Sequence, residues 1–467
     1  MKQIIFAVVL ISIGAACVPH TYVTKKDTNP PVPKTFSAKN SNSLAKKLDS
    51  QWWREFKDSD LDSTIEQGLK SNLDIQMAAA RFEQADAAAR KIGAVYWPRF
   101  DFRMDAGRNQ IINQFFGGDA REFSRFEVSV GVSYEVDLWG KFRSQKQGAL
   151  LDVQASHEDV NAAIMSLTAG ISETWYLLAE QRAQAALLRK QISVNETVLS
   201  LIQTRFEQGL ANALDVFQQK QQLLRTRRRL EPTLAQVRVL ENQLDVLLGR
   251  APTADRAEKP IPLPRLNGLP KMGLPLDLLQ QRPDLKAAHA RVQAADHRIA
   301  SAIADRFPTL RISASAGFLS GDISTILDGL IWNVLGGLVL PLIDGGQRQA
   351  EVRRQRAVLK MTLAQYKKVV ITAVQEVEDA LVRLKRKKSE LVQLQAELDV
   401  ARSAFREAQN RYIQGLSSYL PVLTALVGMQ EAERNELTAQ RQLISHRIQL
   451  YRALGGGMKP SQREESK

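Results

Sequence analysis

The sequence of 467 residues is poor in the side chains that carry most protein chemistry. It has one cysteine, which excludes an intramolecular disulfide, and five histidines, none of them at the spacing of a metal site. It contains neither the G-x-S-x-G motif of serine hydrolases nor the P-loop that holds nucleotide phosphates. We therefore expect a protein that is not an enzyme and that binds no metal and no catalytic cofactor.

Long apolar runs are also missing after the N-terminus. No later segment offers about 20 consecutive apolar residues, the length at which an α-helix spans a bilayer. The net charge is +14, with basic runs at Arg225–Arg229 and Arg383–Lys388. Both runs lie in long helical patterns without the interleaved aromatic residues that stack on bases. We interpret them as solvated helix faces and expect no nucleic-acid partner.

The N-terminus has the layout of an export signal. Lys2 supplies a positive charge, Ile4 to Ile13 is almost entirely apolar, and small residues then lead into Cys17. Residues 1–16 are therefore predicted to be a signal peptide that is removed.

The lone cysteine at the end of this signal resembles the lipobox of bacterial lipoproteins. There the thiol of the matching cysteine is lipidated and becomes the first mature residue, although Gly14 here replaces the usual branched residue. We expect a covalent lipid on Cys17 and an extended N-terminal segment over 17–60; the alternative is ordinary cleavage that leaves a free thiol. Val18, and not an aspartate, follows the cysteine, which implies sorting to the outer membrane.

The chain contains a long internal duplication. Residues 205–216 read RFEQGLANALDV and residues 411–422 read RYIQGLSSYLPV, so Arg205 recurs as Arg411. Further matches continue through both halves, for example Asp86 with Asp296. A repeat this long indicates two structural halves and not a short solenoid unit. The predicted repeats span 61–250 and 274–454, with a linker over 251–273 and a disordered tail over 455–467.

Each half contains two segments in which apolar and polar residues alternate. The alternation predicts strands at about 97–108, 124–137, 308–318 and 330–341, each following a proline-terminated helix or a polar loop. Strands of about 10 residues with one apolar face suit a transmembrane barrel, and the alternative is a soluble sheet with one wet face. Four strands cannot close a membrane barrel, so the membrane interpretation requires several chains.

Long proline-free segments follow the strands in both halves. Within them apolar residues recur every seven positions, from Ile164 to Phe206 and from Val370 to Tyr412, which predicts coiled-coil packing. About 65 helical residues reach roughly 100 Å, so these helices must project out of the membrane. Gly209 and Gly415 suit helix C-termini, which makes each duplicated segment a helix–turn–helix tip.

An ordered set of motifs resembles the TolC-like outer membrane factor family, and most closely its lipoprotein branch that serves multidrug efflux pumps. The motifs are WWREF at 52–56, YEVDLWGKFR at 134–143, QRPDL at 281–285, LPLIDGGQR at 340–348 and the two tips. The resemblance implies a mainly α fold with a membrane β-barrel portion. Three chains would form a homotrimer in which four strands each build a twelve-stranded barrel, continuous with a helical periplasmic tunnel.

The resemblance also assigns roles to tip residues. It implies docking of a periplasmic adaptor protein, itself joined to an inner-membrane transporter, at Arg205, Gln208, Gly209, Leu210, Arg411, Gln414, Gly415 and Leu416. The positions of the family's periplasmic gate are Asp215, Tyr412, Ser417, Pro421 and Thr424. Asp215 and Tyr412 match the gate's aspartate and tyrosine. Ser417 stands where some relatives have arginine, and Pro421 and Thr424 stand where aspartates are typical, which implies a less charged gate.

The predicted function is therefore a passive exit duct of a tripartite efflux pump, lipid-anchored in the outer membrane and opened by an adaptor at its periplasmic tips. Small toxic compounds would pass through it from periplasm to exterior. Two alternatives stay open: an exit duct for type I protein secretion, and a non-channel periplasmic coiled-coil lipoprotein.

Overall fold

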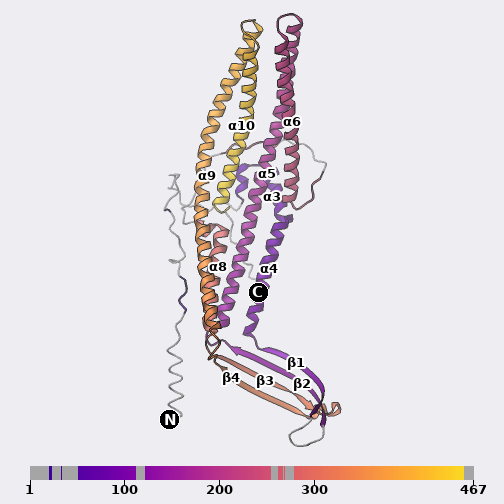
Figure 1. Cartoon of the computed structure of the whole chain (residues 1–467), viewed down its shortest axis with the longest axis vertical. Helices are drawn as coiled ribbons and strands as arrows, with labels where there is room; N and C mark the ends of the chain where they lie inside the picture. The colour runs from indigo at the N-terminus through magenta and orange to yellow at the C-terminus, as the bar shows by residue number, and fades with distance from the viewer. Residues whose placement is uncertain are drawn as a thin grey trace. The chain divides into compact units, whose positions relative to one another are not determined.

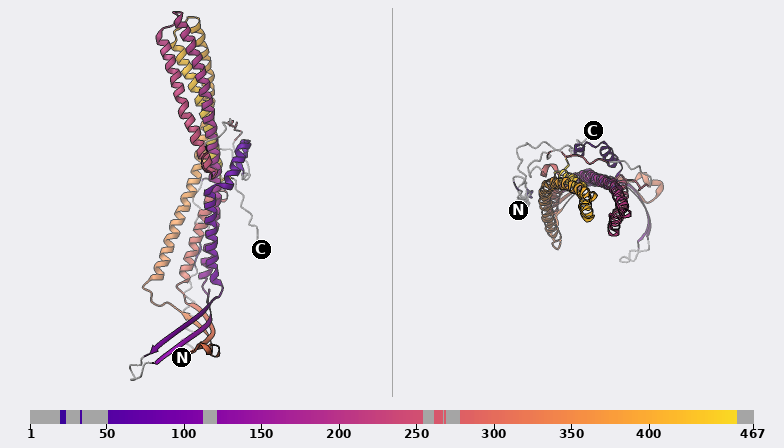
Figure 2. Two further views of the ribbon diagram at one scale, coloured as in Figure 1. Left: turned by 90° about the vertical axis from the view of Figure 1, so that its right-hand side faces the viewer. Right: turned by 90° about the horizontal axis from the view of Figure 1, so that it is seen from above.

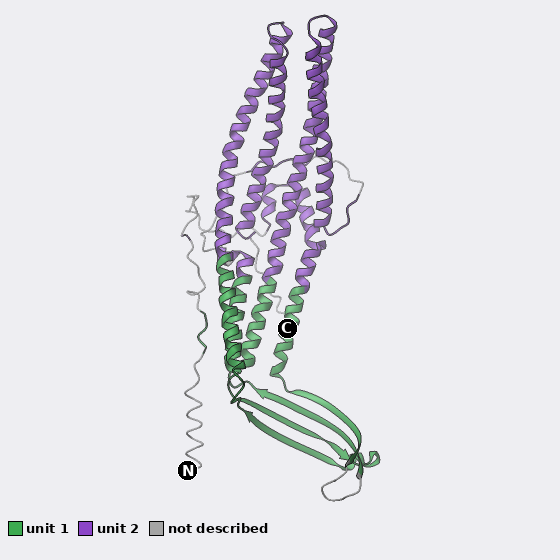
Figure 3. Cartoon of the chain, viewed as in Figure 1, with its two compact units in different colours: residues 1–29, 81–157, 287–368 green, residues 30–80, 158–286, 369–467 purple. Residues whose placement is uncertain are grey.

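The computed structural model describes residues 20–23, 33, 51–111, 121–253, 261–266, 268 and 278–456. The expected signal peptide, Cys17 and most of the predicted tail lie outside these residues. The chain divides into two compact units (Figure 3). Unit 1 comprises Met1–Asn29, Arg81–His157 and Ala287–Lys368, and unit 2 comprises Pro30–Ala80, Glu158–Lys286 and Val369–Lys467.

The order of elements repeats once along the chain (Figure 1). The first half runs η1 (Trp52–Phe56), α3 (Ser59–Ser71), α4 (Leu73–Gly93), η2 (Ala94–Tyr96), β1 (Arg99–Ile111), β2 (Arg121–Val136), α5 (Lys141–Glu207) and α6 (Ala213–Leu247). The second runs α7 (Leu278–Gln281), α8 (Pro283–Ala304), β3 (Thr309–Ser320), η4 (Ile323–Asp328), β4 (Leu330–Val339), α9 (Gln347–Ile413) and α10 (Leu420–Ala453). The predicted fold class, mainly helical with four strands in two repeats, is confirmed. Within the described ranges, none of the helices combines the length and apolar character needed to span a membrane.

Unit 1 contains one antiparallel sheet in the order β1–β2–β3–β4. Its register aligns Val130 with Phe102 on one neighbouring strand and with Ala316 on the other, so an apolar row crosses the sheet. The adjacent row joins Arg103 to Ser129 and lies on the opposite face, because successive side chains of a strand alternate. In β1, β2 and β3 the period-two pattern therefore separates an apolar face from a polar one, as the sequence predicts.

The two edge strands of this sheet are β1 and β4, and β4 is exposed along its whole length. Its side chains are mostly apolar on both faces, with Trp332 74% and Leu335 62% exposed. An apolar, unpaired edge strand needs another chain or a lipid environment to cover it.

At both junctions from strand to helix, an aspartate carboxylate accepts hydrogen bonds from backbone N–H groups. The Asp137 carboxylate accepts from the backbone N–H groups of Phe142 at 3.1 Å and Arg143 at 2.8 Å, at the start of α5. The Asp344 carboxylate accepts from the N–H groups of Gly346 at 2.9 Å and Arg348 at 3.2 Å, at the start of α9. Both carboxylates satisfy N–H groups that the first helical turn leaves without partners.

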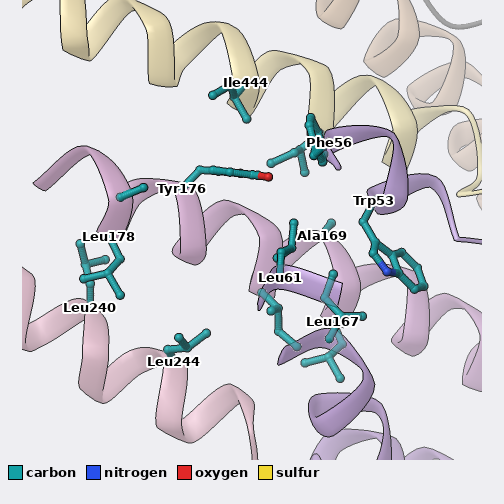
Figure 4. Packing of buried hydrophobic residues seen from close by; sticks show 14 of the residues in the cluster. Trp53, Phe56, Leu61, Leu167, Ala169, Tyr176, Leu178, Leu240, Leu244 and Ile444 are labelled. Carbon is teal, nitrogen blue, oxygen red and sulfur yellow. The ribbon is translucent and has the colours of Figure 1, made fainter. Parts of the chain in front are cut away.

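Unit 2 has an aromatic core at the N-terminal element η1 (Figure 4). The Trp52 ring stacks on Tyr451 of α10 with ring centroids 5.1 Å apart, and Phe56 packs edge-on against Tyr176 of α5 at 5.3 Å. Burial raises the pKa of Tyr176 well above its ordinary value, so this hydroxyl stays neutral. The aromatic residues of the WWREF motif therefore pack against both α5 and α10 in this unit.

The QRPDL motif contributes a buried arginine that connects three helices of unit 2. Arg282, only 5% exposed, donates to Asp284 at 2.7 Å, to Glu376 of α9 at 2.6 Å and to the Ala453 carbonyl of α10 at 3.1 Å. One buried guanidinium thus ties the start of α8 to α9 and α10, with its charge matched by two carboxylates.

In α9 the predicted seven-residue series is buried at Val377, Leu384 and Leu398, whereas Leu391 and Phe405 are half-buried. In α5 the series is buried at Ile171, Leu178 and Ala185, and Phe206 at its end is 46% exposed. From Gln184 onward the buried positions of α5 follow a neighbouring stripe that includes polar amides. That stripe consists of Gln184, Leu188, Gln191, Asn195, Val198 and Ile202.

Removing the ring at the centre of the aromatic core should weaken unit 2 strongly. We predict that Trp52→Ala lowers the free energy of unfolding by about 3–5 kcal/mol, because the large buried ring leaves a cavity. Denaturant unfolding of the purified protein, followed by tyrosine and tryptophan fluorescence and by circular dichroism, measures the change. Val246→Ala, at a site 63% exposed on α6, is the control and should shift the midpoint little. Equal shifts for the two variants would contradict this account.

Candidate functional site

In the two duplicated tips, α5 and α9 end in the same backbone turn. Gly209 and Gly415 have φ angles of +71° and +74°, a conformation that a Cβ atom disfavours. The Leu210 N–H donates to the Arg205 carbonyl at 2.7 Å, and the Leu416 N–H donates to the Arg411 carbonyl at 2.8 Å. This bond pattern, closed by a left-handed glycine, is the Schellman helix C-terminus. Both predicted tip glycines therefore have a structural role.

After the turns the two copies differ. In the first tip Asn212 caps α6: the Asp215 N–H donates to its side chain at 3.0 Å, and the Asp215 carboxylate accepts from the Asn212 N–H at 3.4 Å. The second tip has no such side-chain cap at Tyr419, and Pro421 fills the first turn of α10 instead.

The predicted gate residues Ser417 and Thr424 bond within their own segment. The Ser417 hydroxyl donates to the Ser418 carbonyl at 3.3 Å, and the Thr424 hydroxyl donates to the Leu420 carbonyl at 2.9 Å. In the described part of the chain, no three His, Cys, Asp or Glu side chains gather as metal ligands.

One arginine of the duplicated pair links the two tips. The Arg205 guanidinium lies 4.9 Å from the centre of the Tyr412 ring, and its Nη1 donates to the Ile413 carbonyl at 3.3 Å. The cation thus contacts both an aromatic face and the C-terminal end of α9, where backbone carbonyls carry partial negative charge. Arg411, its counterpart in the second copy, is exposed.

Tyr412 and Asp215 share one electrostatic environment. Tyr412 is 5% exposed, and burial together with the negative charge of Asp215 raises its pKa, against a smaller opposing effect of Arg205. The hydrogen bonds described for Asp215 nevertheless go to Asn212 and not to Tyr412. The structure therefore brings the two predicted gate residues near each other, with the aspartate engaged as a helix cap.

Two residues that sequence reasoning missed lie at the centre of the tip region. The Tyr419 hydroxyl donates to the Gln219 side-chain oxygen at 2.5 Å, and the Gln219 amide donates to the Asn195 carbonyl at 2.8 Å. Both side chains are at most 1% exposed. Burial raises the pKa of Tyr419, which keeps the hydroxyl protonated and able to donate. One chain of hydrogen bonds thus joins α5, α6 and α10.

Further amides continue this chain along unit 2. Gln222 of α6 donates to the Gln430 side chain of α10 at 3.1 Å, and Asn195 donates to the Thr226 hydroxyl at 3.1 Å. Gln191 of α5 donates to the Gln430 carbonyl at 3.1 Å. We call the set Gln191, Asn195, Gln219, Gln222, Thr226, Tyr419 and Gln430 the amide column. The long helices that carry it are drawn from two further directions in Figure 2.

The amide column favours one specific pairing of the helices and contributes less to the free energy of unfolding than an apolar core would. A buried polar group that loses its partner costs about 1–3 kcal/mol, whereas apolar residues on both sides are nearly neutral or stabilising. Polar residues at coiled-coil core positions fix register at the expense of stability. The sequence does contain a sign that these amides are buried. Gln184 and Gln191 are seven residues apart, and the next position at this spacing is the buried Val198.

Matched apolar side chains are exposed at both tips. Leu210 and its counterpart Leu416 are 60% and 65% exposed, and Leu214 and its counterpart Leu420 are 61% and 57% exposed. Phe217 adds a side chain that is 68% exposed beside the first tip. Grouped, exposed apolar residues mark a surface that binds a partner.

The sequence and the fold of this chain are similar to those of known proteins. Residues 64–250 and 274–456 match a family described as outer membrane efflux protein. The pyoverdine export outer membrane protein OpmQ of Pseudomonas putida is 28% identical over 419 residues, covering 88% of each chain. The solvent efflux pump outer membrane protein SrpC of Pseudomonas putida is 30% identical over 423 residues, covering 87% of each. The solved outer-membrane channel OprN superposes with a TM-score of 0.88 at 25% identity, over 94% of this chain and 99% of that one.

Removing the Tyr419 hydroxyl should loosen the tips without unfolding unit 2. We predict that Tyr419→Phe speeds amide hydrogen exchange of residues 205–216 and 411–422 about tenfold, since an unpaired buried Gln219 costs about 1–3 kcal/mol. Mass spectrometry of the exchanged peptides measures this. Tyr451→Phe, a buried tyrosine of unit 2 outside the tips, should leave tip exchange unchanged. Adding Gln219→Leu to Tyr419→Phe should slow exchange again, and failure of both effects would refute a holding role for this bond.

Proposed function

This chain belongs to the outer membrane efflux protein family and is an outer-membrane efflux channel, and we propose that it is the exit duct of a tripartite pump. In this proposal it conducts small toxic compounds passively from the periplasm to the exterior, and a partner supplies the energy. The observation that carries the proposal is the pair of matched tips, with the same backbone turn and the same exposed leucines. The names of OpmQ and SrpC, which refer to pyoverdine and solvents, support a small-molecule cargo for the proposed duct.

The open sheet supports a homotrimer. Backbone groups at the edges of β1 and β4 lack strand partners within the described sheet, and unpaired groups of this kind are not tolerated in lipid. Pairing β4 of one copy with β1 of the next satisfies both edges. Three copies give a twelve-stranded barrel with apolar faces toward lipid, as expected from the family resemblance.

The gate is proposed at the tips. Tyr419–Gln219 and Arg205–Tyr412 join helices that must separate if the passage there widens, and each contact breaks without breaking the backbone. Ser417, Pro421 and Thr424 add no charge, so Asp215 is the one acidic side chain among the predicted gate residues, and we expect an opening less charged than is typical of the family. Binding of the adaptor would favour the separated state.

The adaptor is proposed to dock on the exposed leucines of both tips and on the neighbouring Gln208, Arg411 and Gln414. Two inequivalent tips in each of three chains would present six sites around one opening. The adaptor in turn would connect the duct to an inner-membrane transporter. The proposed lipid on Cys17, outside the described residues, would hold the chain at the membrane.

Charged substitutions at the tip leucines should abolish pumping while leaving the channel assembled. We predict that Leu210→Asp with Leu416→Asp makes cells as susceptible to a panel of toxic compounds as deletion of the gene. Full complementation is expected from the wild type and from Val400→Asp, which alters an exposed apolar residue of α9 outside the tips. Membrane fractionation controls for assembly. An unchanged panel on deletion, together with loss of a secreted protein, would instead favour type I secretion.

Ion selectivity tests the composition of the gate. Single-channel recordings of the wild type should show little preference between cations and anions and no block by low concentrations of multivalent cations. Introducing Pro421→Asp and Thr424→Asp together restores the acidic side chains typical of the family and should produce cation preference and multivalent block. Strong block of the wild type would contradict a weakly charged gate.

A further inference from the structure

A short N-terminal segment is held on α8 in unit 1. We call residues 20–23 the strap. The His20 imidazole lies 2.6 Å from one carboxylate oxygen of Asp296, and the Val23 N–H donates to the other oxygen at 2.7 Å. The Tyr22 ring packs against the His297 ring with centroids 4.9 Å apart. Both oxygens of one carboxylate are thus bound by the strap.

Asp296 differs from its counterpart in the other repeat. Asp86 occupies the matching position of the first half, where it forms an exposed ion pair with Arg90 at 2.8 Å. The position that matches Arg90 in the second half is Ala300, and Asp296 is only 3% exposed. A buried carboxylate is strongly unfavourable unless hydrogen-bonded or paired. The second repeat therefore has no arginine at this position, and the strap supplies the hydrogen bonds to Asp296.

A cavity of about 450 Å³ lies beside the strap. His20 and Tyr22 line it, and the other walls come from the strand–helix junctions of unit 1. Those walls are largely apolar and include Leu138, Trp139, Ile303 and Phe307, with Asp137 and Arg143 as polar members. Trp139 stacks on Phe307 at 5.0 Å and donates its ring N–H to the Pro308 carbonyl at 2.7 Å, which fixes the aromatic wall.

The place of this cavity suits a lipid chain. Trp139 follows the end of β2 and Phe307 precedes the start of β3, and aromatic residues at the ends of membrane strands lie at the lipid–water interface. Cys17 precedes His20 by three residues. Three residues span at most about 10 Å, so a lipid on Cys17 begins within reach of the cavity that His20 lines.

We propose that Asp296 is the docking point of the N-terminal strap and that the cavity beside it holds an acyl chain of the lipid on Cys17. This rests on the lipidation of Cys17 in the proposed function. Docking would fix where the acylated end leaves the protein, so the lipid would steady the strand–helix junction as well as tether the chain. Phospholipid from the surrounding membrane is the competing occupant.

Photo-crosslinking of the full-length protein in its native membrane tests the occupant. We place p-benzoylphenylalanine at Leu138, irradiate, and identify the products by mass spectrometry. The proposal predicts a crosslink to the chain's own N-terminal lipopeptide, reduced about tenfold by His20→Ala or Asp296→Ala, as expected for loss of a hydrogen bond to a charged group. Asp86→Ala, at the matching exposed carboxylate, should change nothing. Crosslinks to membrane phospholipid at equal yield in all variants would overturn the acyl assignment.

Two further measurements separate the parts of the proposal. The Val23 amide should exchange hydrogen slowly in the wild type and faster in Asp296→Ala, and equal rates would overturn the docking point. His20→Ala lies on the strap itself, so its effect does not depend on correct folding of α8. The intact mass of the mature chain shows whether Cys17 carries lipid. An unlipidated chain that still restores compound resistance would overturn the acyl site while leaving the efflux function standing.

Discussion

The structure depends on the unpaired backbone groups at the edges of one four-stranded sheet. In water these N–H and C=O groups of β1 and β4 could bind solvent, but in a bilayer each must find a partner within the protein. An apolar face along the strands and an apolar edge strand suit lipid, and the open edges then require further copies of the chain. The proposed oligomer follows from this requirement, because lipid offers these backbone groups no hydrogen-bond partner.

The tips of unit 2 follow a different physical rule. Their cores contain amides and a tyrosine hydroxyl where a rigid coiled coil would have leucine. Most of these groups bond to a neighbour on another helix, whereas the buried side-chain nitrogen of Gln430 has no hydrogen-bond partner. Such contacts specify one pairing of helices while contributing modest net stability, about 1 kcal/mol each. Helices held this way can exchange one arrangement for another, which is the property that a gate needs. Backbone hydrogen bonds connect the strands of the sheet, whereas side-chain hydrogen bonds connect the helices near the tips.

Much of the fold could be predicted from the sequence, because duplication, a period of two and a period of seven each report directly on local geometry. The amide column was missed because Gln191 and Gln219 resemble surface residues when the apolar residues alone are counted. The cap at Asp215 could have been found, since Asn212 stands three residues before it. The contact of His20 with Asp296 could not, because 276 residues separate them and only tertiary structure brings them together.

The central claim, that several copies of this chain share one membrane channel, is tested most directly by the mass of the particle extracted from the outer membrane. Native mass spectrometry after release of detergent should give three copies of the mature chain, with extraction dependent on detergent. A single copy that stays soluble without detergent would contradict the account.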